Sequence, residues 1–326
     1  MTLLRLNAVA LTRCRFALSP LAETLGTLIA LHRPNTDPAY SDRHARLRPA
    51  LSEWLDRDPV AAGLVPLVAA TKWFPSFVAI PPTGGMNTRL ADELASVAAY
   101  SDDLVRAEIR DSLTACWAEP DTGWLTLDNL GPRVAAVFEH AWTALVAPDW
   151  ARRRAILDRD ITFRAGLVAD HGWHEAIASL RAKPIWSAAE TAIRFSNQDY
   201  PDLDITGEGL IFVPRTTPGG WWTCDNPPAY ALVYQARGTA APMPAPDSDP
   251  LATLLGPGRA RVTRELTAPA TSTQLAALLD ISLGTVGAHL AVLRDAGIIA
   301  GARTGRNVVY HLTPRGESLL AALASE

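Results

Sequence analysis

The chain has 326 residues, of which 48% are hydrophobic and 20% charged, and its formal net charge is −4. This composition indicates a globular protein of about two domains and excludes a disordered or fibrous chain. Cys14, Cys116 and Cys224 lie far apart without CxxC spacing, so the sequence indicates neither a disulfide framework nor a cysteine zinc site. No apolar run is long enough for a signal peptide or a membrane span, so we expect a cytoplasmic protein without a membrane partner.

Residues 1–240 are predicted to form a mostly helical sensor or scaffold domain with a small β element. Two short apolar runs, residues 210–213 and 231–234, are surrounded by proline and glycine and predict a pair of strands. Six stretches have the three- and four-residue apolar spacing of helices: residues 23–31, 47–55, 88–113, 134–145, 152–168 and 174–180.

This domain shows no catalytic constellation, so we predict that the protein is not an enzyme and uses no cofactor. Its histidine cluster, Asp170–Glu175, lacks HExxH spacing and contains a helix-breaking glycine, so we expect no metal site. All ten tryptophans lie before residue 223, where they either line an apolar ligand pocket or fill the core. Trp221 and Trp222 follow Pro218-Gly219-Gly220 in loop-like sequence and are the candidates for an exposed, ligand-binding role.

Residues 241–250 are predicted to form a proline-rich linker between two domains. Pro242, Pro244 and Pro246 alternate there, and a helix cannot continue through such a sequence. An extended, semi-stiff connection and an ordered surface loop packed on both domains are equally consistent with this pattern.

Residues 251–326 contain the parts of a winged helix-turn-helix in order. A cap beginning at Thr271 precedes a buttressing helix, and Asp280-Ile281-Ser282 forms the turn. In the recognition helix that follows, Val286, Leu290 and Leu293 are spaced to face inward.

The end of this segment predicts the wing. The recognition helix stops at Gly297, and residues 298–303 and 306–312 form two strands joined by a turn at Thr304-Gly305. Arg303 and Arg306 flank the tip, where a guanidinium can bond phosphate or enter the minor groove. A closing helix then begins at Thr313-Pro314.

Charge is unevenly divided between the two predicted domains. Residues 251–326 hold seven arginines, no lysine and five acidic residues, so their net charge is +2 while the remainder carries −6. This asymmetry favours a DNA-facing module joined to an acidic partner domain.

The segment resembles the winged-helix domain of the ArsR (arsenic-repressor) family in GPGRARV, STQLAALLDIS, GTVGAHLAVLRDAGII and RTGRNVVYHLT. The resemblance implies a dimer that binds double-stranded operator DNA, with the outer helices in the dimer contact. It places Ser282, Thr285, Gly287, Ala288 and His289 on the recognition helix, and Arg303, Arg306 and Asn307 on the wing; with Thr273 these form the predicted DNA-binding set.

The segment departs from that family in two respects. Gly287 stands where the family often has serine, and a glycine within a helix costs about 1 kcal/mol relative to alanine. Residues 251–326 also contain no cysteine and only His289 and His311 as histidines. The sites of the metal-sensing members cannot be assembled from these residues, so we predict that this domain senses no metal.

The N-terminal region resembles, in SPLAETLGTLIAL and PPAYALVYQARG, the uncharacterised N-terminal region of actinobacterial ArsR-like regulators. This implies a sensor or scaffold domain and leaves the effector open. We therefore predict a homodimeric transcriptional repressor of the ArsR type with a candidate small-molecule effector site. The alternative is a winged-helix protein-interaction module attached to a ligand-binding or enzymatic N-terminal domain.

Overall fold

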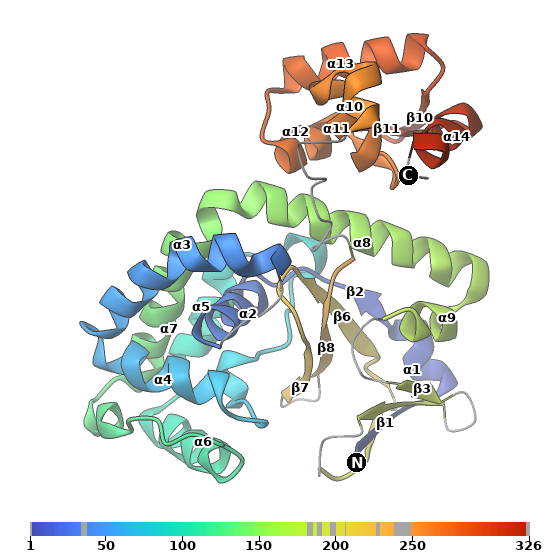
Figure 1. Ribbon diagram of the computed structural model, residues 1–326. Helices are drawn as coiled ribbons and strands as arrows, with labels where there is room; N and C mark the ends of the chain where they lie inside the picture. The colour runs from blue at the N-terminus through green and yellow to red at the C-terminus, as the bar shows by residue number, and fades with distance from the viewer. Residues whose placement is uncertain are drawn as a thin grey trace. The chain divides into compact units, whose positions relative to one another are not determined.

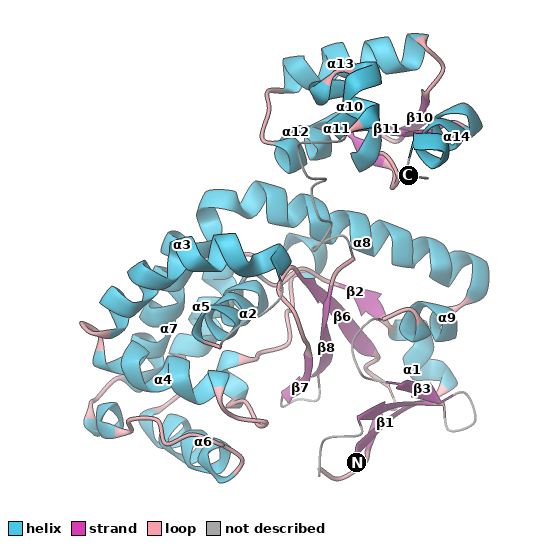
Figure 2. Ribbon diagram, viewed as in Figure 1, coloured by secondary structure: helices cyan, strands magenta, loops and turns pink. Residues whose placement is uncertain are grey.

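The computed structural model describes residues 2–33, 38–180, 185–187, 191–195, 200–205, 207–225, 229–237 and 249–323. The chain divides into two compact units, Met1–Pro148 with Asp160–Ala240 and Asp149–Arg159 with Ala241–Glu326 (Figure 1). Of the linker predicted at 241–250, residues 241–248 lie outside the described part of the chain. The mainly helical fold with small sheets agrees with the predicted fold class (Figure 2).

Nine α-helices, α1 to α9, precede residue 241 in the described part of the chain. Their bounds are α1 Ala8–Arg13, α2 Pro20–His32, α3 Pro38–Leu55, α4 Pro59–Ala69, α5 Leu90–Ala98, α6 Asp102–Thr114, α7 Leu130–Ala141, α8 Trp150–His171 and α9 Trp173–Ala178. α4 was not predicted, because Gly63 and Pro66 interrupt its apolar sequence. Asp58 caps α4 by accepting from the amides of Val60 and Ala61, and Pro59 occupies its first turn.

The single helix predicted over 88–113 is wrong. It is divided into α5 and α6, and Ser101 caps α6 by accepting from the Leu104 amide at 3.4 Å. The apolar spacing continues through the break, so periodicity alone did not reveal it, whereas the serine cap was the available signal.

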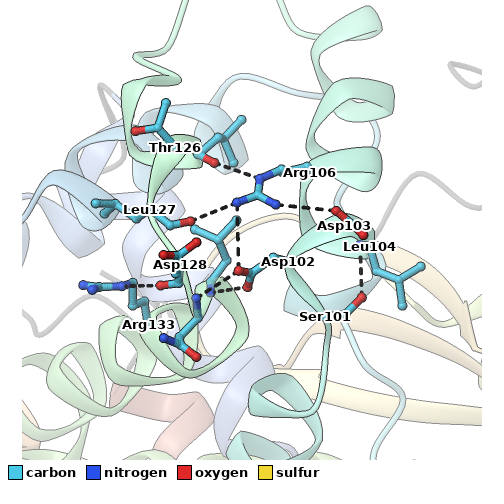
Figure 3. A network of polar contacts seen from close by, with 12 residues as sticks. Ser101, Asp102, Asp103, Leu104, Arg106, Thr126, Leu127, Asp128 and Arg133 are labelled. Carbon is cyan, nitrogen blue, oxygen red and sulfur yellow. Dashed lines mark hydrogen bonds and ion pairs between the residues drawn. The ribbon is translucent and has the colours of Figure 1, made fainter.

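Asp102 of α6 also caps α7, a helix whose own N-cap side chain makes no capping hydrogen bond (Figure 3). Its carboxylate accepts from the amides of Asn129 at 3.0 Å and Leu130 at 2.7 Å. Arg106, one turn along α6, donates to the carbonyls of Leu125 and Leu127. One face of α6 therefore holds both the N-terminus of α7 and the chain that enters it.

The first unit also contains two small sheets. One has the strand order β3-β4-β1-β5 and the other β2-β6-β8-β7. The strands are β1 Thr2–Leu6, β2 Arg15–Phe16, β3 Ile185–Ser187, β4 Ala192–Phe195, β5 Leu203–Ile205, β6 Leu210–Arg215, β7 Trp221–Asp225 and β8 Ala229–Gln235. The two predicted strands are β6 and β8, which pair in parallel.

A buried core and buried polar groups hold this unit together. The apolar cluster includes Leu4, Ile193, Phe212 and Leu232, contributed by strands of both sheets. α2 is buried from Pro20 to Leu31, so it is a central helix and not a surface one. Buried polar groups are tolerated because they are hydrogen-bonded. For example, Asp160 accepts from Arg164 and from the Tyr234 hydroxyl, each at 2.8 Å.

The second unit has the order predicted for a winged helix. Its helices are α10 Pro250–Leu255, α11 Pro257–Glu265, α12 Ser272–Leu279, α13 Leu283–Asp295 and α14 Pro314–Leu323. β10 Ile299–Thr304 and β11 Asn307–Leu312 form the predicted hairpin, and β9 Ala270–Thr271 adds a third strand against β11. Val262, Leu275, Val286, Leu290 and Leu312 belong to its buried core.

No single helix in the described ranges is long and apolar enough to cross a membrane. α12 and α13 satisfy that test only as a pair, and they are bent by 115° at the turn between them.

Candidate nucleic-acid interface

Two caps fix the geometry of the helix-turn-helix. Thr271 and Gln274 form a capping box at the start of α12, in which the Gln274 Oε1 accepts from the Thr271 amide at 2.8 Å. Asp280 ends α12 with φ of 52°, and its left-handed conformation reverses the chain toward α13. Ser282 then caps α13 by accepting from the Thr285 amide at 3.1 Å. The sequence predicted this turn correctly.

α13 has a buried side and an exposed side. Val286, Leu290 and Leu293 are at most 3% exposed, so the prediction that they face inward is confirmed. Arg261 of α11 donates to the carbonyl of Leu279 at 2.8 Å and thereby ties α11 to the end of α12. The exposed side of α13 is therefore presented on a support fixed by both apolar packing and hydrogen bonds.

Most predicted recognition residues lie on exposed surface. Thr273 on α12 and Ser282, Thr285, Gly287 and Ala288 at the start of α13 are all exposed. Gly287 has open space around it, since a Cβ added there would meet no atom within 4 Å. These assignments to DNA stay predictions, but every one of these residues is accessible to a ligand.

His289 differs from the other predicted contacts because it is half-buried. A Cβ added to Gly258 of α11 would lie 2.6 Å from the His289 Nε2. The imidazole therefore packs against the backbone of α11, and Gly258 leaves the room that it needs. Its assignment to DNA stays a prediction like the others.

The wing presents arginine at its tip. β10 and β11 pair from Ile299↔Leu312 to Thr304↔Asn307, and Gly305 has φ of 60° in the turn. The predicted turn at Thr304-Gly305 is displaced by one residue, because Thr304 still belongs to β10 and Arg306 lies in the turn itself. Arg303, Arg306 and Asn307 are exposed.

Other arginines of this unit have structural roles. Arg264 forms an ion pair with Asp249, and hydrogen bonding to Arg264 is the main reason that the pKa of Asp249 is lowered. Arg259 donates to the Leu255 carbonyl and Arg315 to that of Ala296. The positive charge that remains exposed at the wing is therefore carried by Arg303 and Arg306.

Sequence reasoning missed the exposure of Leu283. Its side chain is 54% exposed, although its spacing from Val286, Leu290 and Leu293 is that of an inward-facing residue. Leu283 is the first residue of α13, where the helix has not yet come against the core. Val292, also on α13, is 48% exposed.

The expectation of an exposed loop at Trp221 and Trp222 is wrong. Both belong to β7, which pairs antiparallel with β8, and Trp221 is only 7% exposed. The Trp222 ring is half-buried and lies 5.4 Å from that of Tyr200. β7 pairs with β8, the next strand in the chain, and this backbone pairing overrides the loop-like proline and glycine before the two tryptophans.

Trp221 lines a narrow cavity with residues of α2, β6 and β8. The cavity has room for about one water molecule, so it is not a preformed site for a larger ligand. The buried Trp221 Nε1 has no hydrogen-bond partner among the described residues. Within the same ranges, no three His, Cys, Asp or Glu side chains gather as metal ligands would.

Comparison with known proteins identifies the second unit. A family model described as "Helix-turn-helix domain" matches residues 254–302, which extend from α10 into β10. No curated protein matches the chain. The second unit thus carries a DNA-binding helix-turn-helix domain, followed by strands in the arrangement of a winged helix.

Proposed function

We propose that this protein is an ArsR-type transcriptional repressor that binds its operator as a homodimer. The observation that carries the proposal is the pairing of an exposed α13 surface with an arginine-tipped wing in a helix-turn-helix domain. Such a helix fits the major groove of B-form DNA, and wing guanidinium groups reach phosphates or the minor groove. The proposal locates the protein in the cytoplasm and gives it neither enzymatic activity nor metal sensing through this domain.

The dimer is supported by the outer helices of the second unit. α10 contacts α14, and Leu254 on α10 is 61% exposed. Leu319 and Leu320 on α14 are half-buried. A second copy would cover this apolar surface, and paired modules would then contact half-sites about 10 base pairs apart or a multiple of that.

The test is binding of the full-length chain to the DNA upstream of its own gene. Fluorescence anisotropy should show duplex affinity that falls steeply with salt, because arginine–phosphate contacts release counterions. Sedimentation should show a dimer, and Leu254→Arg should convert it to a monomer with weaker operator binding. Absence of salt-sensitive duplex affinity would reject the proposal, and loss of binding in EDTA would reject the metal-independent part of it.

The second candidate is a winged-helix module that binds protein. The exposed Leu283 and Val292 favour it, because apolar side chains on an exposed helix commonly mark a protein interface. This candidate predicts that a protein partner binds the exposed surface of α13. It also predicts no measurable affinity for duplex DNA at low salt.

For the candidate effector, we place the site beside Trp221 in the first unit. The buried indole N–H without a partner supports an acceptor atom there, and the narrow cavity would have to widen on binding. A fluorescence screen of small carboxylate and carbonyl compounds tests this: hits should release the operator, and Trp221→Phe should weaken their binding.

A further inference from the structure

Resting on the proposed function, we infer that α13 reads thymine methyl groups in the major groove, with Leu283 as the main contact. The inference concerns how a sequence is distinguished and not whether DNA is bound. It follows from the chemistry of the exposed side of α13 and from the hydrogen bonds that already occupy its polar groups.

The exposed residues of α13 up to Val292 carry little polar chemistry, and the large apolar ones lie at its two ends. Leu283 and Val292 are 54% and 48% exposed, and Thr285, Gly287 and Ala288 are exposed between them. Residues 282–293 contain no Arg, Lys, Asn, Gln, Asp or Glu, and the exposed Arg294 and Asp295 of α13 lie in its last turn. The bidentate pairs that identify guanine and adenine need Arg, Lys, Asn or Gln, so this stretch cannot form them.

The hydroxyls on this side are already engaged with each other. The Ser282 Oγ accepts from the Thr285 amide and lies 2.8 Å from the Thr285 Oγ1. On the neighbouring α12, the Gln274 carboxamide oxygen accepts from the Thr271 amide. His289 is half-buried against Gly258. Polar readout by Ser282, Thr285 or Gln274 would compete with the caps that shape the motif.

Apolar contact is the readout that the exposed residues at the start of α13 favour. Only thymine displays a methyl group in the major groove, and apolar side chains distinguish it by burying that methyl group. The arginines of the wing supply the complementary charge that holds the duplex against α13. Thymine is therefore the occupant that matches both the apolar side of α13 and the basic wing beside it.

The experiment separates the methyl group from every other feature of the base. Duplexes bound by the full-length chain are selected from a random library, and each thymine of the recovered site is then replaced by deoxyuridine. Uracil keeps the pairing edge and lacks only the methyl group. Each contacted thymine should lose about fourfold in affinity, the equivalent of about one buried methylene.

A protein variant connects this effect to one residue. Leu283→Ala should weaken the selected site and abolish its sensitivity to uracil at the contacted positions. Leu104→Ala is the matched control, since Leu104 on α6 of the first unit is 53% exposed. That variant should leave both affinity and uracil sensitivity unchanged.

The outcomes are distinct. Failure to bind any duplex overturns the proposed function together with this inference. Salt-sensitive binding that ignores uracil replacement overturns the inference alone. If Leu283→Ala changes self-association and not uracil sensitivity, the apolar side of α13 is a protein interface and the inference is equally overturned.

Discussion

The hydroxyl oxygens of Ser282 and Thr285 lie 2.8 Å apart, and the Ser282 hydroxyl also accepts from the Thr285 amide. One pair of residues thus both begins α13 and defines the first exposed polar group on it. Under the proposed function, the cap that starts the helix would also face the duplex.

Replacing Ser282 tests these two roles separately. Ser282→Ala should destabilise the second unit by about 1 kcal/mol, because the α13 cap is lost. Ser282→Asp retains a capping acceptor and should unfold like the wild type, yet its negative charge should weaken duplex binding. Urea unfolding and fluorescence anisotropy measure the two effects. Wild-type affinity in Ser282→Asp would mean that the start of α13 does not face DNA.

Replacing Arg306 tests whether the wing contacts DNA. Arg306→Ala should weaken all duplexes by a similar factor and reduce the slope of log affinity against log salt by about 1, because one phosphate contact is lost. Arg315→Ala is the control, since that exposed arginine donates to the Ala296 carbonyl away from the wing. An unchanged salt slope in Arg306→Ala would remove the wing from the interface.

The second unit was predictable because its signals are local. Caps at Thr271 and Ser282, a positive φ at Gly297 and Gly305, and inward-facing leucines are each read from a few neighbouring residues. The two errors in this unit concern the exact position of a turn and the start of a helix. The Gly305-Arg306 turn was placed one residue early, and Leu283 follows the inward spacing but lies at a helix start.

The first unit was less predictable because its structure depends on distant residues. β1 at the N-terminus pairs with β4 and β5, almost 200 residues later in the chain. β2 likewise pairs in parallel with β6, and the partners Arg15 and Ile211 are 196 residues apart in the chain. The spacing of apolar residues and the residue types in turns indicate only local structural preference. They carry no information on which distant strand will pair with a given strand.

Gly287 offers a test of how closely DNA approaches α13. A Cβ at this position meets nothing, so Gly287→Ala should stabilise the second unit by about 1 kcal/mol through helix propensity. If the backbone of α13 lies against a phosphate or a base edge, the same methyl group should lower duplex affinity. Thermal unfolding and anisotropy of one variant give both values. A stabilised variant with unchanged affinity would show that Gly287 is not at the point of closest approach.

Glu93 gives the first unit a predicted pH dependence. Burial raises the pKa of this carboxyl group from 4.5 to about 7, although hydrogen bonds from the Ser19 hydroxyl at 2.5 Å and the Leu21 amide at 2.8 Å oppose the shift. The folded state therefore holds a proton that the unfolded state releases above pH 4.5. The free energy of unfolding should fall by about 3 kcal/mol as the pH rises from about 4.5 to about 7 and should be level above that range.

Glu93→Gln isolates this effect, because the neutral amide resembles the protonated acid and keeps an acceptor for the Leu21 amide. The variant should unfold at higher urea concentration than the wild type at pH 8 and should lose the slope between pH 4.5 and 7. Tryptophan fluorescence can follow the transition, since all ten tryptophans precede residue 223. Glu53→Gln, at an exposed residue paired with Arg57, is the control and should retain the wild-type slope. An identical pH profile in Glu93→Gln and wild type would mean that Glu93 is ionised in the folded protein at pH 6.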